Sequence, residues 1–306
     1  MESDGRQSKK NRAWLFYGIA ASVAFVIVYI LATFDPYHFR IIHTLNEILP
    51  IVEEAKKEGD VAVWFCIEDA LTCPDSSLLT SESMEKHKSI WREETRSLTV
   101  NQVRTLNMAM VAAFPQAFID KDASDVLRKI QAQGVPCHGL SFLITGPFDS
   151  IPSLEGWMLQ ELARLGIAFS PLPRWQCSGL YVQNVQMTGL LQRSFCTNGG
   201  VLFTCIGGGD NSWRIESMVY VVLEFWKSCI SASSTRLPKT IILVSNRRDM
   251  LIMVVHKLQQ NHIENRFIGV LRTNDVQEES HTHDPEALRK LIKESILKSL
   301  KEEIPK

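Results

Sequence analysis

The chain has 306 residues, of which 45% are hydrophobic and 22% charged, a composition typical of a globular protein with a sizeable buried core. Its 33 basic and 34 acidic residues almost cancel, so the formal net charge is -1 at pH 7, and no long block of like charge interrupts this balance. This pattern excludes an electrostatic surface for nucleic acid, and we expect no nucleic-acid partner.

Seven cysteines are spread along the chain without a Cys-x-x-Cys pair or a zinc-type spacing. Most of them lie in apolar runs, where a free thiol packs as a small hydrophobic group. The odd number and the wide spacing favour structural thiols over a disulfide framework.

Residues 13–34 form an apolar segment without a charged side chain. A helix of this length crosses the hydrocarbon core of a bilayer, which is about 30 Å thick. Trp14 and Tyr29 lie toward its ends, where amphipathic rings favour the interface. The alternative is a cleaved signal peptide, whose apolar core is usually about 7 to 15 residues long. The length of the segment favours a retained transmembrane helix in contact with the lipid bilayer.

The basic residues near this segment lie mainly before it. Residues 1–12 contain Arg6, Lys9, Lys10 and Arg12, whereas Arg40 is the first basic residue that follows the segment. By the positive-inside rule, residues 1–12 are predicted to be a cytoplasmic tail. The chain is therefore predicted to be a single-pass membrane protein with its domain on the non-cytoplasmic side.

After the segment, residues 35–60 predict a juxtamembrane helix, because apolar residues recur with helical spacing over 41–58. Beyond it, apolar runs typical of buried strands alternate with helical patterns, which favours parallel pairing through crossovers. The predicted strands are 61–67, 135–143, 201–206, 240–244 and 267–271, and the predicted helices are 122–133, 153–165, 212–229 and 247–260. The predicted fold over 61–273 is thus α/β, in three layers with a mostly parallel sheet. Residues 70–120, polar and then helical, predict a small helical insertion after the first strand.

Residues 274–306 predict a loop and then an amphipathic helix that begins at Asp284-Pro285, a cap residue followed by proline at the first helical position. The spacing of its apolar residues favours docking on the domain over binding at the membrane surface. His281, His283 and Asp284 are close enough in sequence for a metal site, but a polar loop that caps the helix is the favoured interpretation.

Polar residues follow three of the predicted strands. The first strand ends in Cys66-Ile67-Glu68-Asp69, the second in Leu140-Ser141-Phe142, and the fourth in Val244-Ser245-Asn246. The ends of parallel strands meet at one edge of an open α/β sheet, where ligands bind. Together with residues 165–167 and 198–204, this pattern resembles the haloacid dehalogenase-like phosphatase superfamily over about residues 60–273, and most closely a group of uncharacterised bacterial proteins within it.

The resemblance implies a Rossmann-type architecture and a phosphatase-type site. In that superfamily the first strand ends in Asp-x-Asp-x-Thr, the second in Thr or Ser, a Lys begins a later helix, and the last motif strand ends in acidic residues. The positions of this chain that match those motifs are Cys66, Glu68, Ser141, Arg214, Ser245 and Asn246.

This sequence departs from the motifs at the residues that carry the chemistry. Cys66 stands where the nucleophilic carboxylate is expected, Glu68 is one methylene longer than the acid, and Ser245 and Asn246 replace acidic metal ligands. A phosphatase of this type needs carboxylates to attack phosphorus, to protonate the leaving oxygen and to hold Mg²⁺. The sequence therefore predicts a pseudo-phosphatase without catalytic residues, metal or cofactor, which acts by binding an unknown protein or small molecule.

Two alternatives remain open at this stage. Glu68, Asp69 and Asp249 could assemble a shifted Mg²⁺ site in a divergent phosphohydrolase, with Cys66 as a thiol nucleophile. A nucleophilic cysteine needs basic neighbours, and those of Cys66 are acidic, so a buried structural thiol is favoured. The other alternative is a structural envelope protein that uses only the anchor and the C-terminal helix. A glycine-rich run, residues 207–211, lacks the Lys-Ser/Thr of a P-loop and is interpreted as a turn.

Overall fold

The computed structural model describes most of the chain after residue 38. The described residues are 39–68, 70–79, 86–143, 145–148, 151–174, 176–177, 179–182, 185–188, 195–204, 211–231, 238–261, 263, 265–273 and 284–302. Arg40–Lys306 form one compact unit. The predicted transmembrane segment, 13–34, lies outside the described residues. Within the described part, no helix combines the length and the apolar character needed to cross a membrane.

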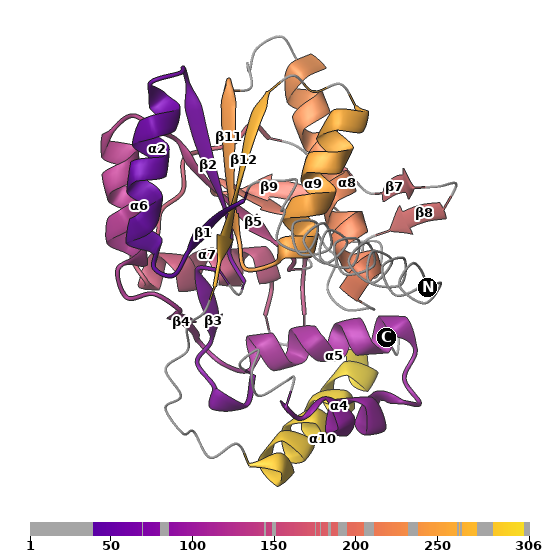
Figure 1. The fold of residues 1–306 in the computed structure, drawn as a ribbon. Helices are drawn as coiled ribbons and strands as arrows, with labels where there is room; N and C mark the ends of the chain where they lie inside the picture. Colours follow the sequence, from indigo (N-terminus) through magenta and orange to yellow (C-terminus); the bar gives the residue numbers. More distant parts are fainter. Residues whose placement is uncertain are drawn as a thin grey trace, which may run out of the picture. The chain divides into compact units, whose positions relative to one another are not determined.

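The centre of the fold is an eight-stranded sheet (Figure 1) with the order β1-β12-β11-β2-β5-β10-β9-β6. The parallel part of the sheet is formed by β1, β12, β11, β2, β5 and β10. Strands β9 and β6 extend the sheet in antiparallel fashion. The strand bounds are Arg40–Ile42 (β1), Val61–Cys66 (β2), Cys137–Ser141 (β5), Gln176–Cys177 (β6), Phe195–Asn198 (β9), Val201–Phe203 (β10), Thr240–Ser245 (β11) and Arg266–Arg272 (β12). The predicted α/β class with a mostly parallel sheet is confirmed.

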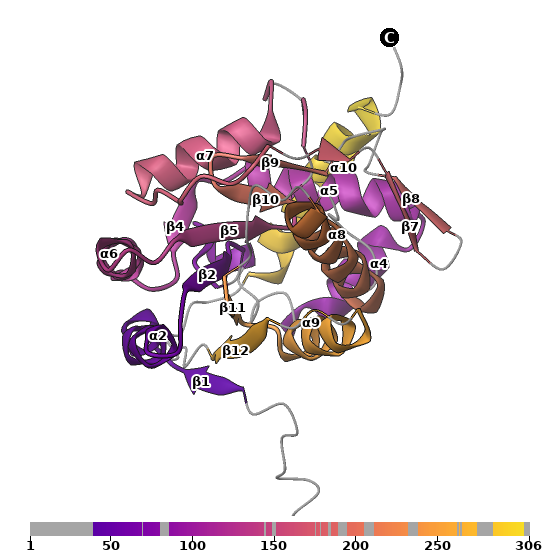
Figure 2. The ribbon, with the colours of Figure 1, turned by 90° about the horizontal axis from the view of Figure 1, so that it is seen from above.

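Helices cover both faces of this sheet (Figures 1 and 2). One face carries α2, α6 and α7, and the other carries α8 and α9. The bounds are Ile48–Lys56 (α2), Ala123–Ala132 (α6), Leu154–Arg164 (α7), Asn211–Ser231 (α8) and Arg248–Gln260 (α9). A separate two-stranded ribbon joins β7 (Gly179–Val182) and β8 (Val185–Thr188).

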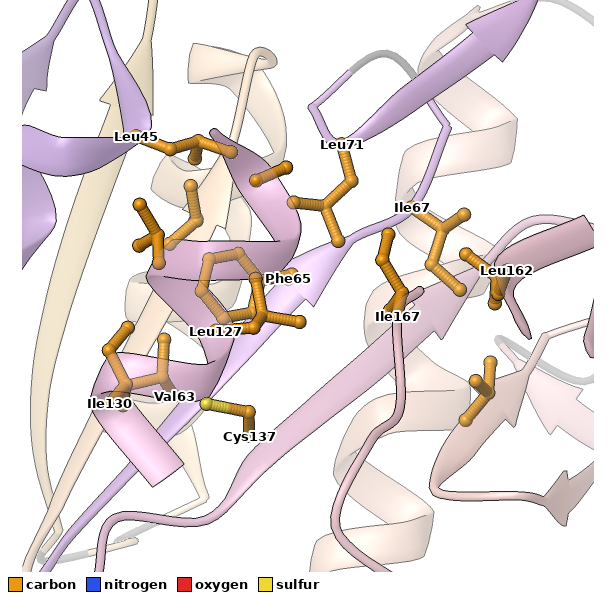
Figure 3. Close-up of a cluster of buried hydrophobic side chains, with 14 of the residues drawn as sticks. Leu45, Val63, Phe65, Ile67, Leu71, Leu127, Ile130, Cys137, Leu162 and Ile167 are labelled. Atoms are coloured by element: carbon orange, nitrogen blue, oxygen red, sulfur yellow. The ribbon is translucent and has the colours of Figure 1, made fainter. Parts of the chain in front are cut away.

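The central strand β2 is buried along its whole length because both of its faces are covered. Val63 and Phe65 belong to the core cluster under α6, where they lie near Leu127 and Ile130 (Figure 3). Side chains alternate across a strand, so Trp64 and Cys66 point to the opposite face, toward α8 and α9. Because the side chains on both faces of β2 are buried, the segment is a continuous apolar run in the sequence.

The predicted helix at 35–60 is wrong in its first part. Arg40–Ile42 form β1, which pairs with β12 at the edge of the sheet. Ile41 is 60% exposed and Ile42 is 1% exposed, the alternation of an edge strand. Helical structure begins only after Thr44, where Thr44 and Glu47 form a capping box ahead of a 3-10 turn, Leu45–Glu47, and α2.

Between β2 and β5, the chain forms a helical insertion beyond the carboxyl ends of the strands (Figure 1). The chain leaves through β3 (Thr72–Pro74) and returns through β4 (Gln116–Phe118), which pair in antiparallel fashion. The insertion contains a 3-10 turn, Ser77–Leu79, and two helices, α4 (Lys88–Thr95) and α5 (Val100–Ala112).

The C-terminal helix α10 (Pro285–Glu302) packs on the insertion rather than on the sheet. Leu288 and Ile292 are fully buried in a second apolar cluster with Ile90, Leu106 and Met110. At the rim, Arg289 pairs with Glu93 (3.1 Å) and Glu94 (2.6 Å). Docking of the apolar stripe on the domain, as predicted from the sequence, is confirmed for its described side chains.

Replacing Ile292 by alanine tests this docking. We expect Ile292→Ala to lower the free energy of unfolding by about 2 to 3 kcal/mol, because it leaves a cavity between α10 and α5. The matched control is Lys290→Ala on the exposed face of the same helix, where the side chain is 77% exposed and a change within about 0.5 kcal/mol is expected. Urea unfolding measures both, and equal effects would show that α10 does not depend on this cluster.

Candidate functional site

The strand ends that carry the motif-like residues are neighbours in the sheet. Strand β2 lies between β5 and β11. Its register places Cys66 opposite Leu140 of β5, and Phe65 opposite Val244 of β11. Because the three strands are parallel, Cys66, Ser141 and Ser245 reach the same edge, here called the carboxyl edge.

Glu68 and Ser141 meet directly at this edge. The Ser141 hydroxyl donates a hydrogen bond of 2.6 Å to Glu68 Oε1, and the Phe142 amide donates one of 3.1 Å to Oε2. Ser141 Oγ also accepts a bond of 3.1 Å from the Leu143 amide. Both carboxylate oxygens of Glu68 are thus used to join the ends of β2 and β5, which is a structural role.

Cys66 is covered by a methionine of α9. Its thiol is 1% exposed and lies 3.6 Å from Met250 Sδ. Ser245, also 1% exposed, places its hydroxyl 3.6 Å from the same sulfur and accepts a 3.0 Å bond from the Arg247 amide. The positions of the expected nucleophile and of one metal ligand are therefore closed by a neutral, polarizable side chain.

The remaining candidates do not join this cluster in the described part of the chain. Asp249 is 56% exposed and pairs with Arg247 at 3.2 Å. Asn246 is half-buried in the turn after β11. Asp69, the glycine-rich residues 207–210, His281 and His283 lie outside the described residues, as does the side chain of Arg214.

Asp284, the third member of the possible metal group near the C-terminus, caps a helix. Its carboxylate accepts a hydrogen bond of 2.9 Å from the Glu286 amide at the start of α10. This is the local role expected of an acidic residue directly before a helix.

The donor groups that meet at the carboxyl edge do not fit Mg²⁺. They comprise a thiol, two hydroxyls and a carboxylate that already accepts two hydrogen bonds. Magnesium requires several oxygen ligands at about 2.1 Å, usually with carboxylates among them. Among the residues that the structure describes, no group of three or more His, Cys, Asp or Glu side chains is arranged to hold a metal ion.

A buried arginine at the same edge was missed by sequence reasoning. Arg272, the last residue of β12, is 5% exposed. Burial lowers the pKa of its guanidinium, and the nearby carboxylate of Asp120 opposes this effect. Because Arg272 directly follows the predicted strand, 267–271, no signal in the sequence marks it as buried.

The described residues also line an open cavity of about 410 Å³ at the opposite end of the strands, here called the amino edge. Its walls include Trp64 of β2, His138 of β5 and Phe225 of α8. Trp64 and His138 are register partners on adjacent strands, and their ring centroids are 5.0 Å apart. Sequence reasoning placed both only within predicted strands, 61–67 and 135–143, because their pairing depends on the register.

His138 is held as a neutral ring. Its Nδ1 lies 3.0 Å from the Ser170 carbonyl oxygen, which can only accept, so Nδ1 carries the proton and donates it. Burial lowers the pKa of the imidazole to about 4, and the bond to Ser170 opposes this only in part. In a neutral ring with the proton on Nδ1, Nε2 is an acceptor.

Comparison with known proteins adds no family to this description. No family model, curated protein or solved structure matches the chain at a significant level.

The hydrogen bonds that Glu68 accepts from Ser141 and Phe142 give one prediction. Glu68→Gln places an amide donor against the Ser141 hydroxyl or the Phe142 amide, so we expect a loss of about 1 to 3 kcal/mol in unfolding free energy. Asp249→Asn, at an exposed carboxylate of the alternative metal set, is the matched control and should change stability by less than about 1 kcal/mol. Chemical unfolding checks both, and a neutral Glu68→Gln would contradict the structural role.

His138 gives a second, pH-dependent prediction. Its folded-state pKa, about 4, lies below the ordinary value of 6.5. Between these two pH values the unfolded chain therefore binds a proton at this residue, whereas the folded chain does not. Stability is therefore complete above pH 6.5 and is lost as the pH falls toward 4, by at most about 3 kcal/mol for this group. In His138→Asn, an amide replaces the Nδ1 donor and this part of the pH dependence disappears. Parallel unfolding profiles for the two proteins between pH 7 and pH 4 would refute the assignment.

Proposed function

We propose that this chain is a membrane-anchored, haloacid dehalogenase-like pseudo-phosphatase, which does not hydrolyse phosphate esters and works by binding a partner or ligand. Residues 13–34 serve as the bilayer anchor, with residues 1–12 in the cytoplasm and the domain on the other side of the membrane. The charge distribution and the apolar length of that segment support this part of the proposal.

The order of the strands supports the phosphatase-like ancestry. The three strands with motif-like ends, β2, β5 and β11, are adjacent, and β2 is the central one. A serine ends β5, as the second motif of the superfamily requires, and it hydrogen-bonds Glu68 two residues beyond Cys66. Positions that are far apart in sequence thus converge as they do in a phosphatase-type site.

The observation that carries the loss of catalysis is the environment of Cys66. A nucleophile must reach phosphorus in line, whereas this thiol is 1% exposed beneath Met250. Glu68 is also poorly placed to act as a general acid, because both of its carboxylate oxygens accept bonds, from Ser141 and Phe142. Neither side chain is available for its step in the reaction.

The geometry does not favour the magnesium-dependent alternative. Asp249 lies in the first turn of α9, where its carboxylate faces Arg247 and solvent. Glu68 faces β5, with both oxygens engaged. A site that used both groups would have to break the bonds that join the strand ends.

A phosphatase assay on the full chain tests the proposal. We expect no hydrolysis of p-nitrophenyl phosphate with Mg²⁺ from zero to 10 mM, and the same background rate for Cys66→Ala and Glu68→Gln. An active phosphatase in the same buffer is the positive control, and cooperative unfolding shows that each variant is folded. Turnover that depends on Mg²⁺ and that either substitution abolishes would overturn the proposal.

A further inference from the structure

The cavity at the amino edge has the features of a small-molecule site. Its volume of about 410 Å³ lies in the range of natural ligand pockets, about 300 to 1,000 Å³. It lies at the starts of β2 and β5, whereas the motif-like residues follow the ends of those strands. The two sites are therefore separate.

Prolines and aromatic rings form much of the lining of the cavity. Four of the lining residues are prolines, Pro136, Pro171, Pro173 and Pro238, whose rings restrict the backbone. On the sheet side, Trp64 is 4% exposed and packs edge-to-face against Phe225 and Trp226, with ring centroids 5.9 Å apart in each pair. Aromatic and proline surfaces of this kind favour a flat, apolar ligand that enters a preformed site.

The charged groups at the rim are already engaged. Lys56 donates a 2.8 Å bond to the Gln133 carbonyl, and the Asp60 carboxylate accepts a 3.1 Å bond from the Lys239 amide. Cys229 also lines the cavity, and burial raises the pKa of its thiol, so this group is neutral at pH 7. The lining contains one lysine and one aspartate, whose charges balance, so a neutral ligand fits it best.

His138 supplies one directional contact. Its Nδ1 is committed to Ser170, and no described residue bonds to its Nε2, which is left as an acceptor in a ring that lines the cavity. An acceptor in the wall of a mostly apolar cavity favours a ligand with a donor.

We propose that this cavity binds a small, flat, neutral and mostly apolar molecule whose N–H or O–H group donates a hydrogen bond to His138 Nε2. Aromatic heterocycles and phenols belong to this class. Binding at the amino edge does not require the carboxyl edge to be inactive. The binding proposal is therefore independent of the proposed loss of phosphatase activity.

Indole and 1-methylindole, which differ in the N–H group, are the probes. Ligand-observed NMR titrations of the full chain compare them for the wild type, for His138→Phe, which keeps a ring but lacks the acceptor, and for Cys229→Phe, which fills the cavity. Because its cavity is filled, the Cys229→Phe protein also gives the background signal from probe that binds outside this cavity. Cooperative unfolding establishes that each variant is folded.

We expect the wild type to bind indole about three- to tenfold more tightly than 1-methylindole, the usual effect of one hydrogen bond. His138→Phe should bind the two probes equally, and Cys229→Phe should bind neither above background. Absence of indole binding up to 5 mM, binding that persists in Cys229→Phe, or a preference for indole that survives in His138→Phe would each overturn the proposal. If Cys229→Phe does not fold, Ala62→Leu, on the β2 wall of the cavity, replaces it with the same expectation.

Discussion

The parallel register of β11, β2 and β5 determines which side chains meet at each end of these strands. It pairs Trp64 with His138 near one end of the strands and Cys66 with Leu140 near the other. Because side chains alternate along β2, Val63 and Phe65 fill the core under α6, whereas Trp64 and Cys66 face α8 and α9. A slip of one residue would exchange these two faces, so the burial of both faces holds the register in place.

The two ends of the strands differ in how their polar groups are satisfied. At the carboxyl edge, a thiol and a hydroxyl lie against Met250, and Glu68 joins the ends of β2 and β5. The neutral thiol and hydroxyl allow tight packing there, since a buried carboxylate without a metal or a donor is costly. At the amino edge, by contrast, an open cavity lies beside Trp64, His138 and Phe225, and four prolines contribute to its lining.

The C-terminal helix and the insertion share one apolar cluster. The insertion supplies Ile90, Leu106 and Met110, and α10 supplies Leu288 and Ile292. On the other side, Ala109 of α5 packs in the main core cluster, so α5 lies between the two clusters. This arrangement links the last helix of the chain to the region beyond the carboxyl edge, although more than 150 residues separate α5 from α10 in the sequence.

The sequence by itself determined the α/β class, because continuous apolar runs such as 61–67 and helical spacings such as 122–133 are local properties of the chain. It also identified Asp284-Pro285 as a helix start, since capping depends on neighbouring residues. It misassigned Ile41 and Ile42 to a helix. Their spacing fits the helical pattern of the residues that follow, but in the structure they form a strand because they pair with β12. Only the tertiary structure decided that Met250 covers Cys66, that Glu68 bonds Ser141, that Arg272 is buried, and that Trp64 and His138 share a cavity. The physical reason is that these contacts depend on strand register and helix packing, which join residues too far apart in sequence for any local pattern to relate.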